Sequence, residues 1–337
     1  MRRMSFRVVG GLALVMAIAS FAFTGCAEEA TESNGSAAPA SPAMSELTIG
    51  VSIPAADHGW TAGVKWWAER AMEMYPEINW KLATALDPAK QISDIETMMA
   101  QGIDAIVILA TESAPLTPVA KEAHERGIFI VNVDRGFLEP VADLFIEGDN
   151  EAFGRKSAEF MVDKLGGEGK IVILEGIPST VNSDRVEAAL EVFHAHPEIE
   201  ILGQQPGKWN RETALAVMET FLQQHDEIDA VWASDDDMAL GALQAIQEAG
   251  REDEMWMLGG AGMKDIVKRV MENDPMFPAD ITYPPSMIAT GIHLCVSTMR
   301  DGQKDRVMQF MPRHLLLDVE LITPENAEDY YFPDSVY

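Results

Sequence analysis

Short apolar runs alternate with segments of helical periodicity along most of the chain. In one of these segments, Val64, Trp67, Ala68 and Ala71 recur at the spacing of one helix face. In the first half, the pattern predicts strands at residues 47–52, 78–84, 105–109 and 128–133, and helices at residues 61–75, 88–101 and 115–126.

The same rhythm restarts after Asp149-Asn150. It predicts helices at residues 152–165, 183–194, 212–224, 238–249 and 264–272, and strands at residues 170–174, 199–204, 230–233 and 255–258. A tail follows, with a strand near residues 279–282, a long helix near 286–300 and a strand near 314–319.

This double βα series predicts an α/β fold with two parallel sheets, each covered by helices. The length of 337 residues suits two domains better than one core. Because the tail adds elements after both series, we expect it to return to both halves and to cross between them several times. Multiple crossings would form a hinge between two Rossmann-like lobes.

The N-terminal segment has the features of a processing signal. A basic region precedes an apolar run over residues 8–23, which is shorter than most membrane spans. The run ends in Phe23-Thr24-Gly25-Cys26, which resembles the bacterial lipobox, although that motif usually has Leu where Phe23 stands. We therefore expect a lipoprotein signal peptide at residues 1–25, a lipid such as palmitate on Cys26, and a flexible tether at residues 26–45. An ordinary signal peptide with an incidental Cys is the alternative.

Charge and motif content exclude several classes of function. The formal net charge of −29 disfavours nucleic-acid binding, which needs a basic face, and it fits either simple solubility or life in high salt. The sequence contains no nucleophile elbow and no His-Glu-x-x-His pattern, so we expect no enzyme activity, no metal site and no cofactor. Cys295 lies in an apolar helical stretch and is expected to be a buried thiol.

Candidate binding residues follow the predicted strands, because ligands of open α/β sheets lie beyond the carboxyl ends of the strands. Asp, Asn and Arg side chains suit hydroxyl groups, and aromatic rings pack on the apolar faces of a sugar. The candidates are Asp57, His58, Trp60, Glu112, Asp134, Arg135, Arg185, Trp209, Asn210, Asp235 and Tyr283.

Several candidates have a structural alternative. Trp60 could be a core aromatic, Asp134 could be an N-cap or a loop acid, and Asp235 could cap the helix that begins at Met238. Arg185 could pair with Glu187 or Asp184 on a helix surface. His58 could be a loop residue without a role.

One segment carries a family resemblance. Residues 231–243 read as an apolar strand followed by Ser234-Asp235-Asp236-Asp237-Met238-Ala239-Leu240-Gly241-Ala242, and Val133-Asp134-Arg135 and Gly148-Asp149-Asn150 support the match. From about Leu47 to Val319, the chain resembles the periplasmic sugar-binding proteins of the ribose/galactose type, which are cluster-B, type I binding proteins of ABC importers.

The resemblance implies a Venus-flytrap fold with three crossings between the lobes. It places the N-terminal lobe at residues 46–149 plus 284–312 and the C-terminal lobe at residues 150–283 plus 313–337, with Asp149 and Asn150 at the first hinge crossing. It implies sugar contacts by Asp134 and Arg135, an aromatic contact by Trp60 with Asp57 before it, and second-lobe contacts by Arg185, Trp209 and Asp235.

The sequence also departs from the family pattern. The family usually has a second-lobe Asp where this chain has Gly260-Ala261-Gly262, a polar Gln where Tyr283 stands, and in some members Asn where Leu109 stands. These differences point away from ribose or glucose and toward another sugar, a polyol or a less hydroxylated ligand.

The expected function is capture of a sugar or sugar-like polyol by hinge closure and delivery to an ABC permease in the membrane. The protein would act as a monomer in the periplasm or on the outer face of the cytoplasmic membrane, anchored through Cys26. The alternative is a sensory module that presents its ligand to a chemoreceptor or sensor kinase.

Overall fold

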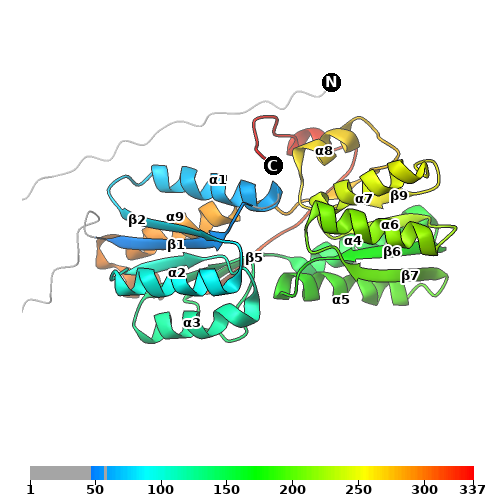
Figure 1. Ribbon diagram of the computed structural model, residues 1–337. Coiled ribbons are helices and arrows are strands. Elements are labelled where there is room, and N and C mark those ends of the chain that lie inside the picture. Colours follow the sequence, from blue (N-terminus) through cyan, green and yellow to red (C-terminus); the bar gives the residue numbers. More distant parts are fainter. Residues whose placement is uncertain (1–46, 57–58) are drawn as a thin grey trace, which may run out of the picture. The chain divides into compact units, whose positions relative to one another are not determined.

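The structure is a computed structural model that describes residues 47–56 and 59–337. These residues belong to one compact unit. It contains two parallel sheets with helices packed on them, which confirms the expected fold class (Figure 1). The expected signal peptide, the tether, Cys26, Asp57 and His58 lie outside the described residues.

Among the described residues, six strands form the sheet of the first lobe in the order β11-β5-β4-β3-β1-β2, and all neighbours are parallel. The strands are β1 (Thr48–Pro54), β2 (Asn79–Ala85), β3 (Ala105–Ile108), β4 (Phe129–Val133), β5 (Leu144–Gly148) and β11 (His314–Leu317). The helices of this lobe are α1 (Gly59–Glu73), α2 (Pro88–Ala100), α3 (Ser113–Glu125) and α9 (Met287–Met299).

Alternate residues of the central strands divide the first lobe into two apolar cores. Val107 and Val131 join the core on the side of α1 and α9, whereas Ile106 and Ile130 join the core on the side of α2 and α3. Successive side chains of a strand point to opposite faces, so a sheet covered on both faces needs continuous apolar strands. The apolar runs of the sequence predicted these strands for that reason.

The second lobe contains a four-stranded parallel sheet in the order β7-β6-β8-β9 within the described part of the chain. Its strands are β6 (Gly169–Glu175), β7 (Ile199–Pro206), β8 (Ala230–Ala233) and β9 (Trp256–Leu258). Its helices are α4 (Asn150–Leu165), α5 (Thr180–His194), α6 (Arg211–Gln224), α7 (Asp236–Ala249) and α8 (Lys264–Met271).

Two glycines let the helices of the second lobe pack closely in pairs. A Cβ atom on Gly154 of α4 would lie 2.0 Å from the carbonyl oxygen of Arg185 in α5. A Cβ atom on Gly241 of α7 would lie 2.1 Å from the carbonyl oxygen of Arg211, where α6 begins. Both distances are far below van der Waals contact, so only glycine fits at these two positions.

The chain passes between the lobes at three places within the described residues. The first lies between β5 and α4, the second between β10 (Asp280–Ile281) and α9, and the third between β11 and β12 (Leu321–Ile322). β12 pairs antiparallel with β10, and Thr282 forms a bridge with Ala261 of the second lobe. All three passages therefore lie close to the strand ends that were expected to form the site.

The last crossing differs from the expected boundary between residues 312 and 313. His314–Leu317 pairs with β5 in the sheet of the first lobe, so the chain returns to the second lobe only after Leu317. The strand pattern alone does not reveal which sheet edge accepts a late strand. The sequence pattern also did not predict β5, β12, α10 (Lys304–Val307) or α11 (Ala327–Tyr330).

No helix within residues 47–56 and 59–337 has both the length and the apolar character needed to cross a membrane. Cys295 is a buried free thiol on α9, and burial raises its pKa to about 12. This position agrees with the expected core thiol.

We predict that Gly154→Ala lowers the free energy of unfolding by about 1–3 kcal/mol, because overpacking forces α4 away from α5. Urea unfolding followed by circular dichroism measures the change. Glu159→Ala is the matched control, because Glu159 is exposed on the same helix. Equal midpoints for the two variants would contradict the close packing of α4 and α5.

Candidate functional site

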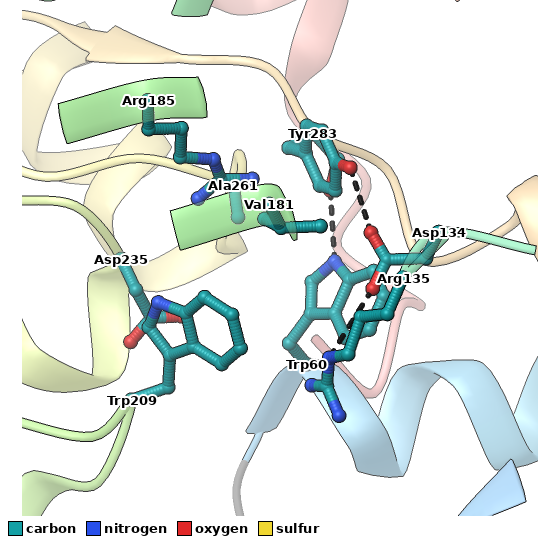
Figure 2. Close-up of a pocket in the computed structure, with 9 residues that line it drawn as sticks. All are labelled: Trp60, Asp134, Arg135, Val181, Arg185, Trp209, Asp235, Ala261 and Tyr283. Carbon is teal, nitrogen blue, oxygen red and sulfur yellow. Dashed lines mark hydrogen bonds and ion pairs between the residues drawn. The ribbon is translucent and has the colours of Figure 1, made fainter. Parts of the chain in front are cut away.

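The strand ends of both lobes surround a small cavity (Figure 2). Both lobes and the second crossing contribute to its lining, which consists of Trp60, Asp134, Arg135, Val181, Arg185, Trp209, Asp235, Ala261 and Tyr283. The space among these side chains that protein atoms leave unfilled is about 290 Å³, part of which is open to solvent.

The first lobe supplies an acidic and a basic side chain directly after β4. Asp134 has a positive φ of 67°, which turns the chain sharply at the end of the strand. Arg135 is buried, and its Nη1 donates to the carbonyl oxygens of Ala110 and Thr111, both at 3.0 Å. These bonds fix the guanidinium group at the edge of the cavity.

Trp60 and Tyr283 form a wall that links α1 to the second crossing. The indole Nε1 of Trp60 donates to the carbonyl oxygen of Tyr283 at 2.9 Å. The hydroxyl of Tyr283 donates to Oδ1 of Asp134 at 2.7 Å. A Cβ atom on Gly148 would lie 2.1 Å from Cε2 of Tyr283, so the ring fits only because residue 148 has no side chain.

Arg185 enters the cavity from α5 of the second lobe. Its Nε donates to Oδ1 of Asn150 at 2.9 Å, and its Nη1 donates to the carbonyl oxygen of Ser234 at 2.7 Å. The guanidinium carbon lies 3.9 Å from the ring centroid of Phe153 and 4.2 Å from that of Tyr283. Arg185 is therefore a buried residue of the cavity wall, and the alternative of a surface pair with Glu187 or Asp184 was wrong.

Trp209 faces the first lobe from a strained turn. Lys208 and Trp209 both have positive φ values, 60° and 52°, which are uncommon for residues with side chains. The carbonyl oxygen of Glu175 accepts from the backbone N–H of Lys208 at 2.9 Å, which holds the turn. The guanidinium carbon of Arg135 lies 4.9 Å from the Trp209 ring centroid, so this indole stacks on the basic group of the opposite lobe.

The first two residues of the Asp235-Asp236-Asp237 motif have different roles. Asp235 lines the cavity and also caps α7, since its Oδ1 accepts from the backbone N–H of Met238 at 3.0 Å. Asp236 is fully buried and accepts from the backbone N–H groups of Gly260 and Met263, both at 2.8 Å. The motif therefore combines a cavity residue with a residue that holds the loop after β9.

Asp237, the third residue of the motif, connects the lobes. Its Oδ2 accepts from the backbone N–H of Gly59 at 2.8 Å, and its Oδ1 pairs with Nη2 of Arg211 at 2.9 Å. Gly59 begins α1 of the first lobe, so the positive end of that helix faces a carboxylate of the second lobe.

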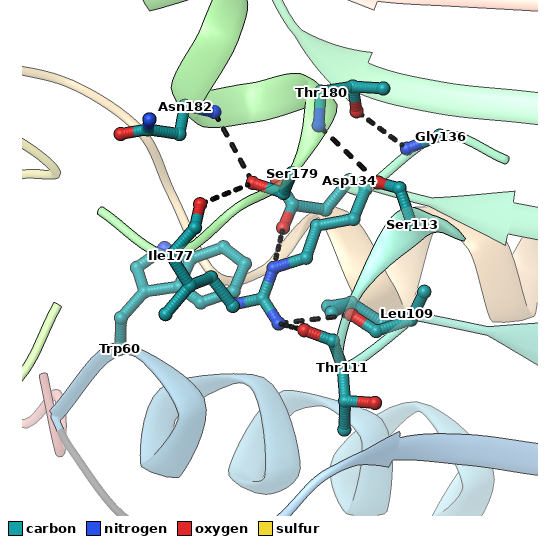
Figure 3. A network of polar contacts seen from close by, with 12 residues as sticks. Trp60, Leu109, Thr111, Ser113, Asp134, Gly136, Ile177, Ser179, Thr180 and Asn182 are labelled. Carbon is teal, nitrogen blue, oxygen red and sulfur yellow. Dashed lines mark hydrogen bonds and ion pairs between the residues drawn. The ribbon is translucent and has the colours of Figure 1, made fainter. Parts of the chain in front are cut away.

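A second connection between the lobes lies at the start of α5. Oγ1 of Thr180 accepts from the backbone N–H of Gly136 at 3.0 Å, and the backbone N–H of Thr180 donates to Oγ of Ser113 at 3.3 Å (Figure 3). Gly136 and Ser113 belong to the first lobe. These contacts are available only when the lobes are close together.

The structure places most of the expected binding residues at one site. Trp60, Asp134, Arg135, Arg185, Trp209, Asp235 and Tyr283 line the cavity together. Glu112 and Asn210 do not line it; they line a neighbouring hollow that shares Arg135 and Trp209 with it, and Asn210 caps α6. Asp149 caps α4 at the first crossing, and Asn150 binds Arg185 and Tyr283 through its side chain.

Two residues that line the cavity, Val181 and Ala261, were not among the binding residues predicted from the sequence. Both lie in segments that follow strands, so strand-end position was the available signal. Neither residue has a polar side chain, and a search for hydroxyl-binding groups therefore passes over them.

The cavity holds groups suited to binding a polar molecule with apolar faces. It combines two guanidinium groups and two carboxyl groups with two indoles and a phenol ring. Among the described residues, no cluster of three or more His, Cys, Asp or Glu side chains could hold a metal ion.

Comparisons with known proteins agree with this geometry. The family described as "Periplasmic binding protein domain" matches residues 49–301. The ribose import binding protein of Bacillus subtilis (strain 168) is 30% identical over 246 residues, which cover 72% of this chain and 78% of the relative. The xylitol-binding protein of Mycolicibacterium smegmatis is 32% identical over 200 residues, which cover 59% of this chain and 57% of the relative.

A solved structure extends the similarity to three dimensions. The periplasmic binding protein of the arabinose ABC transporter from Shewanella sp. ANA-3, bound to α- and β-L-arabinofuranose, superposes with a TM-score of 0.74 at 27% identity. The superposition covers 85% of this chain and 94% of that protein.

We predict that Thr180→Val shifts the protein toward an open arrangement of the lobes. One hydrogen bond of about 1 kcal/mol corresponds to a roughly fivefold change in the closed-to-open ratio. Small-angle X-ray scattering should give a larger radius of gyration for Thr180→Val than for wild type. Thr220→Val is the control, because its hydroxyl bonds only within α6. Superimposable scattering of wild type and Thr180→Val would refute the interlobe role of Thr180.

We predict a specific pH dependence for Asp280, which is fully buried close to Asp236. Burial raises the pKa of Asp280 to about 7, and burial and the nearby Asp280 raise the pKa of Asp236 well above its usual range. The folded protein therefore retains protons that the unfolded chain releases near pH 4, so stability falls as the pH rises from about 4 through 7.

Asp280→Asn should make this fall shallower in urea unfolding measured between pH 4 and pH 8. Asp253→Asn is the control, because Asp253 is exposed in a turn. Parallel stability profiles for wild type and Asp280→Asn would show that the buried acid does not titrate as expected.

Proposed function

The chain belongs to the periplasmic binding protein family, and we propose that it captures a small neutral sugar or polyol for an ABC importer. The observation that carries this proposal is the cavity between the lobes, where paired acidic and basic side chains meet indole rings. Hydroxyl groups can donate to carboxylates and accept from guanidinium groups, and the C–H faces of a sugar pack on aromatic rings.

The contacts between the lobes support a binding cycle based on closure. In the open form, the first-lobe residues Asp134 and Arg135 would receive the ligand. Closure would then bring Trp209 and Arg185 onto it and exclude water, because both residues lie in the second lobe. The ligand would favour the closed form through these second-lobe contacts, which it cannot make in the open form.

One buried donor adds to this support. Nε1 of Trp209 is buried and has no hydrogen-bond partner among the described residues. Buried N–H groups are nearly always paired, so a ligand hydroxyl at this point would satisfy a group that the protein leaves open.

We further propose a location and a protein partner for the chain. The chain would be anchored through lipid on Cys26, with residues 26–45 as a tether, on the outer face of the cytoplasmic membrane or in the periplasm. It would act as a monomer and dock in its closed form on the membrane permease. The relatives support the importer partner, because the Bacillus protein is named for ribose import and the Shewanella protein for an arabinose transporter.

We predict that at least one of D-ribose, D-allose, L-arabinose and xylitol, or a related sugar, raises the melting temperature of the wild type. Micromolar affinity, roughly −8 kcal/mol, is expected by isothermal titration calorimetry. Asp134→Ala should weaken that affinity at least about 100-fold. The substitution removes a buried carboxylate from the cavity and leaves the hydroxyl group of Tyr283, another cavity residue, without its acceptor.

Glu96→Ala, on the exposed face of α2, is the control and should bind as the wild type does. Circular dichroism checks that Asp134→Ala is folded. Unchanged affinity in a folded Asp134→Ala protein would move the binding site away from this cavity. Failure of every pentose, hexose and polyol to bind would refute the proposed ligand class.

A further inference from the structure

We propose that the ligand lacks a hydroxyl group on the edge that faces Tyr283, and that Tyr283 is the residue that selects for this absence. The inference rests on the proposed sugar-binding function and narrows it. It assigns the ligand to neutral deoxy sugars, or to polyols with a comparably bare edge.

The first observation concerns the carboxylate of Asp134, which is 2% exposed. Its Oδ1 accepts the hydroxyl proton of Tyr283 at 2.7 Å, and its Oδ2 lies 3.6 Å from Nε of Arg135. Figure 2 shows both oxygens turned toward these protein groups. A carboxylate engaged in this way offers a ligand fewer acceptor positions than one that faces an open cavity.

The second observation is that Tyr283 cannot move aside for a hydroxyl group. Its hydroxyl also accepts from Nδ2 of Asn150 at 3.2 Å, and its carbonyl oxygen accepts from Nε1 of Trp60. A Cβ atom on Gly148 would lie 2.1 Å from Cε2 of its ring, and the ring centroid lies 4.2 Å from the guanidinium carbon of Arg185. Burial and the charge of Asp134 raise the pKa of Tyr283 well above its usual range, so the hydroxyl stays a donor.

The third observation is that the cavity wall continues as apolar groups from Tyr283. Val181 and Ala261 line the cavity together with Tyr283 and Trp209 (Figure 2). Ala261 is held in place by its backbone N–H, which donates to the carbonyl oxygen of Ile281 at 2.7 Å, and its φ is 121°. A ligand hydroxyl pressed against this wall would lose its hydrogen bonds to water without replacement.

The charges of the cavity complete the description of the ligand. Asp134 and Asp235 balance Arg135 and Arg185, so the lining carries no formal excess of either sign. A charged ligand would be buried without a counter-charge, which strongly disfavours its binding. The cavity therefore favours a neutral molecule with a polar edge toward Arg135 and Asp235 and an apolar edge toward the ring of Tyr283, Val181 and Ala261.

The test compares sugars that differ by one hydroxyl group. The pairs are D-ribose with 2-deoxy-D-ribose, D-galactose with D-fucose, and L-mannose with L-rhamnose, each titrated calorimetrically into wild type, Tyr283→Phe and Tyr330→Phe. For at least one pair, the wild type should bind the deoxy sugar about tenfold more tightly, as expected when a buried hydroxyl would remain unpaired. Tyr283→Phe releases Oδ1 of Asp134 and should reduce this preference to about threefold or less, by improving binding of the hydroxylated sugar.

Tyr330→Phe is the matched control, because Tyr330 bonds to Glu320 outside the cavity and its removal should leave the preference unchanged. The wild-type preference does not depend on the folding of any variant. If the wild type binds sugars but prefers the deoxy member of none of the pairs, the inference is overturned while the sugar-binding function stands. If it binds no sugar or polyol, both are overturned.

Discussion

Two guanidinium groups are buried where the lobes meet, and their need for acceptors organises the site. Arg135 is satisfied by carbonyl oxygens of its own lobe, and Arg185 by Asn150 and Ser234 of the other. Each guanidinium group is therefore held before the lobes close. Closure adds an aromatic face to Arg135, which stacks on Trp209 of the opposite lobe. Hydrogen bonds within each lobe therefore stabilise the buried charge of its guanidinium group. The contacts that form between the lobes can be weaker and reversible.

The three consecutive acids Asp235, Asp236 and Asp237 act at three different places: one lines the cavity, one holds a loop and one connects the lobes. Successive residues at the start of a helix point in different directions, so neighbouring carboxylates face different partners. Asp235 faces the cavity, Asp236 the loop after β9, and Asp237 the first turn of α1. Movement of α1 against the second lobe is consequently coupled to the same segment that lines the binding cavity.

The sequence predicted the order of most strands and helices, because a sheet covered on both faces requires continuous apolar strands. It did not predict β5, in which partly exposed Phe145 and Glu147 alternate with buried residues, or the sheet to which β11 belongs. Strand-end position brought Trp60, Arg185 and Trp209 together correctly. It could not show that Glu112 lies in a neighbouring hollow or that Asn150 supports Arg185, since both depend on how side chains pack across the lobes. Residues without polar atoms, such as Ala261, carry no chemical signal in a sequence, although their shape limits the ligand.

The missing side chain of Gly148 has a consequence for the history of this protein. Any larger residue there would collide with the ring at position 283, so an aromatic residue at 283 can persist only while residue 148 remains glycine. A lineage that exchanged Tyr283 for a smaller polar residue would be free to vary at 148, whereas the reverse order of changes would pass through a damaged intermediate. The two positions, which lie far apart in the chain, are therefore expected to vary together among descendants that have changed ligand.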